Sequence, residues 1–167
     1  MFVSKQFHPG EGSHIPVLIK VLQKTDGPVL ELGTGFNSTP VLHWLCAKTK
    51  RKLVSYESVP TFWDIAKNYI TDFHEVHFID DWDKLDLSQH WNVIFIDHAP
   101  GKRRVVELER VAQLADYVIV HDTEAKSDWH YKFSKGFPAY KYRYDYTDAY
   151  PNTSVLSNFK DVSKICE

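Results

Sequence analysis

The stretch PVLELGTGFNSTPVLHWL, residues 28–45, joins a short apolar run to a pattern with the period of a helix. The apolar run ends at Gly33, and Gly35 follows two residues later, in a chain that has only seven glycines. Because glycine carries no side chain, its backbone can turn tightly and lie close to a bound molecule. The stretch therefore predicts a buried strand, a loop of close approach and a helix from about residue 38 to residue 48.

The same alternation of strand and helix continues on both sides of this stretch. Further strands are predicted at 52–57, 75–80, 91–97 and 116–122. Helices are predicted at 14–24, with Ser13 as a cap, and at 60–71 and 101–115. Five strands that alternate with helices indicate parallel strands joined by right-handed crossovers.

The last part of the chain changes to the period of a strand. Residues 140–146, YKYRYDY, place four tyrosines on one face and charged side chains on the other. Residues 153–159, TSVLSNF, follow the turn DAYPN and predict an antiparallel partner. The expected fold is α/β: a doubly wound, mostly parallel seven-stranded sheet with an antiparallel C-terminal hairpin and helices on both faces.

Composition narrows the class of protein. We expect one domain over residues 1–167, with an irregular arm at 1–12 and a helix at 13–25 that acts as a partial lid. A net charge of -2 argues against nucleic acid as a partner. The chain shows no apolar run of membrane-spanning length and no signal-peptide pattern, so we expect no membrane partner and a cytoplasmic location.

Polar side chains follow the predicted strands at the edge where doubly wound sheets bind ligands. They are Glu31, Glu57, Asp81, Trp82, Asp97, His98, His121 and Asp122. A carboxylate inside an apolar strand, as at Glu31, costs free energy unless it has a partner. An acid at the end of the second strand, as at Glu57, can accept hydrogen bonds from ribose hydroxyls, and Asp81 can accept one from an adenine amino group.

The glycine loop alone has more than one interpretation. A dinucleotide fingerprint requires a third glycine, and Ser38 stands in its place. A tight turn with no ligand is also compatible with two glycines. The loop by itself therefore leaves a nucleotide site and a plain turn open.

Taken in order, the segments VLELGTGFNST, LVSYE, FIDDW and VIFIDHAP resemble the successive motifs of class I S-adenosylmethionine-dependent methyltransferases. The C-terminal hairpin fits the same family, so the resemblance covers about residues 29–159. It implies that the methionine part of S-adenosylmethionine lies against Glu31, Gly33 and Gly35. Asn37 and Ser38, in the same loop, are also predicted to bind the cofactor. It also implies that Glu57 holds the ribose, that Asp81 and the Trp82 backbone hold the adenine, and that Asp97 faces the methionine amino group or the acceptor.

Methyl transfer to oxygen also requires a group that removes the proton of the acceptor. His98 and His121, beside Asp97, are the candidates at the sheet edge. Either histidine could instead fasten a loop. The catalytic set predicted from the sequence is His98, His121 and Asp97.

A metal-dependent variant is the less favoured interpretation. The segments FIDHAPGK and VIVHDTE resemble the catechol O-methyltransferase group, and Asp97 and Asp122 match aspartates that hold magnesium there. Thr123 stands where that group has asparagine, so no metal is expected. The cations of GKRR, residues 101–104, are read as a surface turn or as an anchor for an acidic acceptor.

We therefore expect an S-adenosylmethionine-dependent methyltransferase that methylates oxygen on a small-molecule acceptor. An NAD-dependent oxidoreductase and a non-catalytic cofactor-binding partner subunit are the alternatives. Few residues precede the first strand, so the acceptor site is expected to be open, completed by the arm at Phe7 to His14, or completed by a second copy of the chain.

Overall fold

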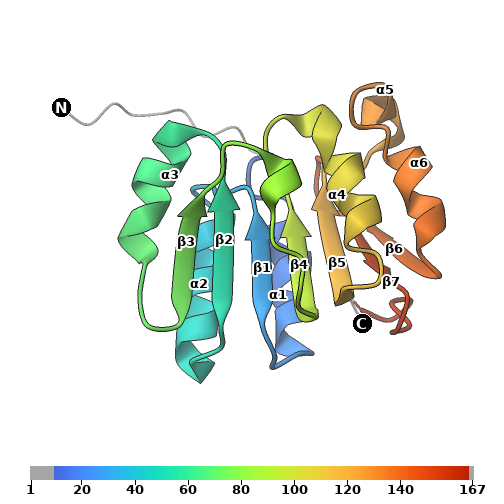
Figure 1. Cartoon of the computed structure of the whole chain (residues 1–167). Helices are drawn as coiled ribbons and strands as arrows, with labels where there is room; N and C mark the ends of the chain where they lie inside the picture. Colours follow the sequence, from blue (N-terminus) through green and yellow to red (C-terminus); the bar gives the residue numbers. More distant parts are fainter. Residues whose placement is uncertain (1–9, 166–167) are drawn as a thin grey trace.

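The structure is a computed structural model, and it describes residues 10–165. Its strands form one seven-stranded sheet in the order β3-β2-β1-β4-β5-β7-β6 (Figure 1). The strands are β1 (Val29–Leu32), β2 (Leu53–Glu57), β3 (His74–Phe78), β4 (Trp91–Ile96), β5 (Ala115–His121), β6 (Tyr142–Tyr146) and β7 (Thr153–Ser157). Strands β1 to β5 pair in parallel, whereas β7 pairs antiparallel with β5 and β6. The predicted topology and hairpin are confirmed.

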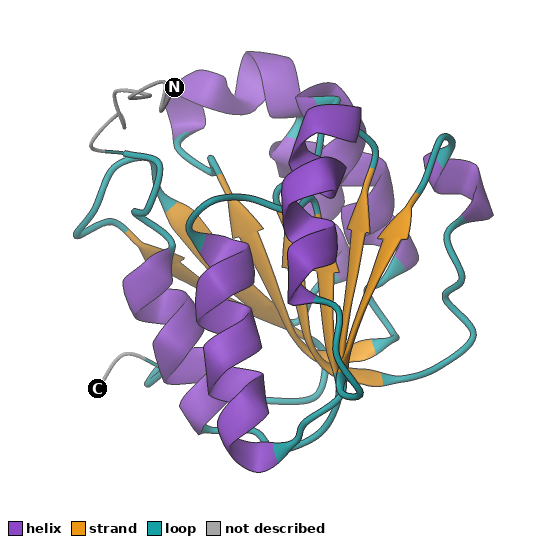
Figure 2. Ribbon diagram, turned by 90° about the vertical axis from the view of Figure 1, so that its left-hand side faces the viewer, coloured by secondary structure: helices purple, strands orange, loops and turns teal. Residues whose placement is uncertain are grey.

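Helices lie on both faces of the sheet (Figure 2). The α-helices are α1 (Ile15–Gln23), α2 (Ser38–Thr49), α3 (Pro60–Ala66), α4 (Arg104–Arg110), α5 (Asp128–Tyr131) and α6 (Phe133–Gly136). The short 3-10 turns are η1 (Lys67–Tyr69), η2 (Trp82–Lys84), η3 (Gly101–Arg103), η4 (Ala125–Ser127) and η5 (Phe137–Ala139).

Two apolar clusters fill the space between the sheet and its helices. On one face, Leu18 of α1 and Leu42 of α2 pack with Phe95 of the sheet. On the other face, Leu108 of α4 and Phe133 of α6 pack with alternate residues of the same strands. The central strands are mostly apolar because both of their faces are covered, and Glu31 is the exception inside β1. This double layer holds the carboxyl ends of β1 to β5 at one common edge.

Some predicted boundaries are wrong. Ser13 does not cap α1, since its N-cap is His14 and no side chain caps the helix. The segment 60–71 remains α-helical only to Ala66 and tightens into η1. The segment 101–115 begins with η3, so Arg104 is the first α-helical residue.

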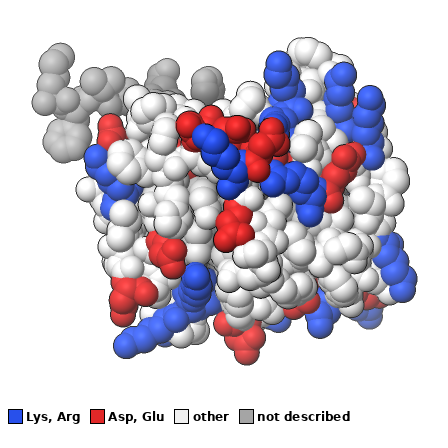
Figure 3. All heavy atoms as spheres, viewed as in Figure 1, with Lys and Arg blue, Asp and Glu red and all other residues white. Residues whose placement is uncertain are grey.

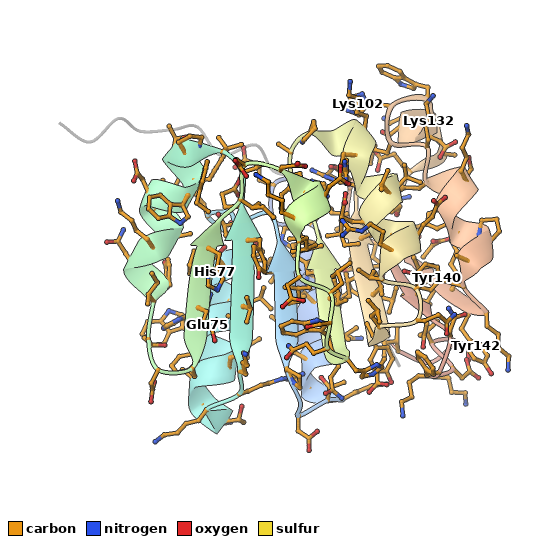
Figure 4. All side chains as sticks on the ribbon, in the orientation of Figure 1. Glu75, His77, Lys102, Lys132, Tyr140 and Tyr142 are labelled. Atoms are coloured by element: carbon orange, nitrogen blue, oxygen red, sulfur yellow. The ribbon has the colours of Figure 1, made fainter. Side chains whose placement is uncertain are left out.

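The tyrosine face of β6 is confirmed for three of its four members. Tyr142, Tyr144 and Tyr146 pack against the cluster that contains α1 and α2. Tyr140 lies outside the strand and donates a hydrogen bond from its hydroxyl to the Leu108 carbonyl at 2.7 Å. It therefore packs on the opposite side of the sheet from Tyr142 (Figure 4).

The N-terminal arm is described only in part. Residues 1–9, which include Phe7, lie outside the described residues. Within residues 10–165, no helix is long and apolar enough to cross a membrane.

Candidate active site

A cavity of about 860 Å³ opens at the carboxyl ends of the parallel strands. Its walls come from the loop after β1, the residues after β2, β4 and β5, the turn before α1, and the β6–β7 connection. The lining residues are Gly10, Glu11, His14, Thr34, Gly35, Phe36, Asn37, Ser38, Glu57, Val59, Phe62, Asp97, Ala99, Arg104, His121, Asp122, Tyr150 and Pro151. The volume falls within the range of roughly 300–1,000 Å³ of small-molecule sites.

The two glycines that follow β1 serve different purposes. Gly33 has a φ of +93°, and a Cβ atom there would lie 2.4 Å from the His98 Cα. Only glycine fits that position, because the chain turns in the left-handed region against a neighbouring backbone. Gly35 lines the cavity, and a Cβ atom there would meet only the Ser38 hydroxyl, at 3.6 Å. The fold therefore requires Gly33, whereas Gly35 leaves cavity space open.

Glu31 lies beneath this loop and does not line the cavity. Its carboxylate accepts hydrogen bonds from the hydroxyls of Ser38 at 2.7 Å, Thr39 at 2.9 Å and Ser55 at 2.6 Å. Thr39 in turn accepts a hydrogen bond from the Gly35 amide at 3.0 Å. Three hydroxyls of the protein thus satisfy the buried Glu31 carboxylate. Through Thr39, Glu31 also positions the glycine loop from below.

The burial of Glu31 makes a pH-dependent contribution to stability. Burial raises the pKa of the Glu31 carboxyl from 4.5 to about 7, although three hydroxyls oppose the shift. Between these values the folded chain binds a proton that the unfolded chain has lost, so this contribution to stability falls as the pH rises. We expect the wild type to lose stability relative to Glu31→Gln between about pH 4.5 and pH 7, with a constant difference outside that window. Urea unfolding at intervals of pH measures this difference, and one that stays constant throughout would contradict the assignment.

Glu57 lines the cavity, but its carboxylate is already fully hydrogen-bonded. One oxygen accepts from the Thr34 amide at 2.7 Å and the Thr34 hydroxyl at 3.0 Å. The other accepts from the amides of Ser58 and Val59, both at 2.7 Å. A ribose hydroxyl can therefore reach this carboxylate by replacing the Thr34 hydroxyl, which is the one partner free to rotate.

Five of the predicted site residues lie outside the cavity lining: Glu31 and Gly33, described above, and Asp81, Trp82 and His98. Asp81 is exposed and caps η2 by accepting from the Asp83 amide at 3.0 Å. Trp82 is buried and donates from its indole nitrogen to the Ala99 carbonyl at 2.9 Å. His98 is buried against Trp82, with ring centroids 4.1 Å apart, and its Nε2 lies 3.2 Å from a Glu107 oxygen. The sequence predicts His98 as a catalytic candidate, but in the structure its ring points into the fold and does not line the cavity.

Asp97 and Asp122 meet at one arginine on the cavity floor. Arg104 Nη1 lies 2.8 Å from Asp97 Oδ1 and 2.8 Å from Asp122 Oδ2. Burial opposes the charge of Asp97, yet Arg104 and His121 hold the pKa of its carboxyl at about 2. Both aspartates line the cavity as predicted, but the sequence did not predict the cation that joins them.

His121 lies on the cavity wall with both ring nitrogens occupied. Its Nδ1 lies 3.3 Å from the Asp97 carboxylate, which only accepts. Its Nε2 lies 2.8 Å from the Ser13 hydroxyl, whose single proton goes to the Pro151 carbonyl at 2.7 Å. Both nitrogens must then carry protons. Burial alone would lower the pKa of His121, but the contact with Asp97 raises it, and the two hydrogen-bond contacts leave no free lone pair on the ring.

His14 also lines the cavity, but it differs from His121 in its hydrogen bonds and in the direction of its pKa shift. It is 2% exposed, and neither ring nitrogen has a hydrogen-bond partner in the described structure. Burial and the neighbouring His121 lower the pKa of His14 to about 4, so its ring is neutral at neutral pH. Its ring lies 4.7 Å from that of His121 and 4.9 Å from that of Phe95, measured between centroids. His14 is thus the cavity histidine with a free lone pair.

The turn that carries His14 is fastened across the cavity. Ser13 contacts His121 and Pro151, and the Asn37 side-chain amide donates to the Glu11 carbonyl at 3.1 Å. A Cβ atom on Gly10 would lie 2.7 Å from the Pro151 ring. These contacts tie the start of α1 to the β6–β7 connection and to the glycine loop.

In the GKRR segment, residues 101–104, both arginines form ion pairs within the protein. Arg103 contacts Asp83 at 2.6 Å and Glu107 at 3.1 Å, and Arg104 turns inward. Lys102 is exposed and points away from the fold (Figure 4). Lys and Arg gather at the corner formed by α4, α5 and α6, whereas acidic side chains gather around η2 (Figure 3). Two carboxylates, at Asp97 and Asp122, already share the Nη1 of Arg104.

The structure resembles solved methyltransferases over most of its length. A methyltransferase from Podospora anserina with bound S-adenosylhomocysteine covers 89% of this chain and 78% of its own, at 12% identity and a TM-score of 0.64. The O-methyltransferase TomG from Streptomyces achromogenes, in complex with S-adenosylmethionine, covers 89% and 79% at 14% identity and 0.64. Human methyltransferase-like protein 13, with S-adenosylhomocysteine, covers 92% and 83% at 17% identity and 0.65. The chain has the class I methyltransferase fold.

At identities of 12–17%, these similarities establish the fold alone. The activity has to be inferred from the residues of the site. No protein-family model matches the chain, and no curated protein matches it.

Proposed function

We propose that the chain is an S-adenosylmethionine-dependent methyltransferase that methylates a hydroxyl oxygen of a small molecule. The observation that supports this most strongly is the cavity at the strand ends, which brings Gly35, Glu57 and Asp97 together beside a neutral, unpartnered His14. When bound, S-adenosylmethionine supplies a methyl group on a positively charged sulfur.

The cavity fits that cofactor in shape and in charge. Gly35 leaves open space at the loop, and Glu57 stands at the end of β2. Four carboxylates line the cavity, at Glu11, Glu57, Asp97 and Asp122, against two cations, at Arg104 and His121. The excess of negative charge favours a ligand that carries a sulfonium and an ammonium group. Neither the Asp81 nor the Trp82 side chain lines the cavity, so in this proposal the two residues support the adenine end of the site without contacting the cofactor through their side chains.

The residues of the chain also supply a route for the proton. An acceptor hydroxyl donates its hydrogen bond to the free lone pair of His14, and the proton passes to that ring as the oxygen is methylated. Asp97 lies close to His14 and favours the imidazolium that forms. His121 and Arg104 keep Asp97 ionised throughout. His14 therefore replaces His98 and His121 as the proton acceptor.

Calorimetry with S-adenosylmethionine, S-adenosylhomocysteine and NAD tests the cofactor. The proposal predicts saturable binding of the first two ligands and none of NAD. Binding of NAD alone would replace the proposal by a nicotinamide-dependent oxidoreductase. Binding of none of the three would favour a non-catalytic partner subunit.

We expect Gly35→Val to weaken S-adenosylhomocysteine binding by about tenfold or more, since the new side chain fills cavity space that the fold itself leaves open. Thermal stability should stay close to that of the wild type, because a Cβ atom at this position has no short contact with the protein. Calorimetry and thermal melting measure the two effects on the same sample. Unchanged affinity would remove this loop from the binding site.

A further inference from the structure

Two partly exposed carboxylates converge on one point of the cavity floor. Asp97 Oδ1 and Asp122 Oδ2 each lie 2.8 Å from the same Arg104 nitrogen, at the ends of neighbouring strands β4 and β5. Asp122 also has a φ of 63°, a conformation that costs free energy and persists only where surrounding contacts impose it. The Tyr131 hydroxyl donates to Asp122 Oδ2 at 2.8 Å and helps to hold it there. Two ionised carboxylates brought this close require a cation between them.

Arg104 is held in that place by the backbone as well as by the carboxylates. Its Nε donates to the His98 carbonyl at 2.7 Å, and its Nη2 donates to the Asp97 carbonyl at 3.1 Å. Its guanidinium also lies over the Tyr131 ring, 5.1 Å from the centroid. Arg104 opens α4, where the helix dipole disfavours a cation. The carboxylates of Asp97 and Asp122, together with these backbone carbonyls, compensate that cost.

The same floor carries ligands suited to a divalent metal. Ligand atoms of His14, Asp97 and His121 lie within 4.8 Å of one another. Carboxylate oxygens together with a neutral imidazole suit a divalent ion such as Mn²⁺. In the wild type, both nitrogens of His121 are engaged in hydrogen bonds, and the Arg104 charge lies beside Asp97. A divalent ion at Asp97 would have to approach that charge at close range.

We propose that Arg104 is the resident cation of this site: its guanidinium occupies the place between Asp97 and Asp122 that a divalent metal would otherwise take. Arg104 is then a positioning residue, since it orients both carboxylates and neutralises one of them without a dissociable ion. A protein of this kind works at the site without a divalent metal. Removal of the guanidinium converts the cavity floor into a metal site. The inference does not depend on methyl transfer, because the metal alone can serve as the probe.

The test is equilibrium binding of Mn²⁺, followed by the electron paramagnetic resonance of the free ion, to the wild type and to Arg104→Gln. We expect Arg104→Gln to bind one Mn²⁺ at least about tenfold more tightly than the wild type. The double variant Arg104→Gln with Asp122→Asn should lose the added site, because one of its two carboxylates is gone. Arg104→Lys, which keeps a positive charge, should exclude Mn²⁺ as the wild type does.

Three results would overturn the inference. The first is a wild type that binds one Mn²⁺ as tightly as Arg104→Gln does. The second is an Arg104→Gln variant with no gain in Mn²⁺ affinity over the wild type. The third is an Arg104→Lys variant that binds Mn²⁺ as tightly as Arg104→Gln does. Thermal melting with and without Mn²⁺ covers a variant that is too unstable for the binding assay. Mn²⁺ should raise the melting temperature of Arg104→Gln and leave that of the wild type unchanged, and an absence of this difference would also contradict the inference.

Discussion

Gly33→Ala is expected to destabilise the whole domain. A Cβ atom at this position would lie 2.4 Å from the His98 Cα and 2.5 Å from its amide nitrogen, and the backbone has a φ of +93°. Left-handed strain and overpacking together cost about 2–6 kcal/mol of the free energy of unfolding. Since each kcal/mol lowers the melting temperature of a domain of this size by roughly 2–4 °C, a loss of about 10 °C is expected.

Gly35→Ala is the matched control for this change. The two positions lie in the same loop, but the added Cβ atom at Gly35 meets only Ser38 Oγ, at 3.6 Å. Thermal melting of the two variants side by side should show a large loss for Gly33→Ala and almost none for Gly35→Ala. Equal losses would mean that the loop does not turn against His98 as the structure describes.

His14→Phe is expected to remove most of the catalytic rate while leaving the fold intact. Phenylalanine preserves the ring that packs on Phe95, and the wild-type ring nitrogens have no hydrogen-bond partner to lose. Loss of a positioned proton acceptor lowers a rate by about 10²–10⁴-fold. The measurement is the release of S-adenosylhomocysteine in the presence of hydroxyl compounds that the wild type methylates.

His90→Phe serves as the control for this substitution. His90 is exposed and precedes β4 at the opposite end of the sheet, where it contacts Asp116 at 3.3 Å. Its replacement should leave the rate unchanged. S-adenosylhomocysteine binding should also survive in His14→Phe, so that a lost rate is separable from a lost cofactor site. A His14→Phe variant with the wild-type rate would eliminate His14 as the proton acceptor.

The sheet could be predicted from the sequence because its signals are local. Apolar runs mark β1 and β4, and the alternating tyrosines mark β6, so the parallel pairing of the first five strands and the C-terminal hairpin follow from connection rules. The strand-end rule likewise places Glu57, Asp97 and Asp122 at one edge, where the structure has them. These inferences need only the period of a segment and the point at which it ends.

The side-chain partners could not be predicted in the same way. Glu31 lies in β1 and Asp97 directly follows β4, so the two acids look alike in the sequence. Glu31 accepts hydrogen bonds from hydroxyls below the loop, whereas Asp97 pairs with Arg104 in the cavity. His121 is the last residue of β5 and reaches the cavity, whereas His98 lies two residues after the end of β4 and is buried against Trp82. Each outcome depends on residues distant in sequence, which no local pattern specifies.

Two site residues outside the predicted catalytic and cofactor-binding sets left a weak signal in the sequence. His14 precedes a proline-containing helix start, in a turn with two glycines that could pack closely on other segments. Arg104 is a cation in the first turn of a helix, an unfavourable position that suggests an acidic partner. Tyr150 and Pro151, on the β6–β7 connection, gave no signal, because the sequence does not show that this turn reaches the site.

The central measurement is a crystal structure of the protein with S-adenosylhomocysteine. We expect the ligand to lie in the cavity between Gly35 and Glu57, with its sulfur toward the floor formed by His14 and Asp97. Ligand bound elsewhere on the molecule, or a cavity left empty at saturating ligand, would contradict it.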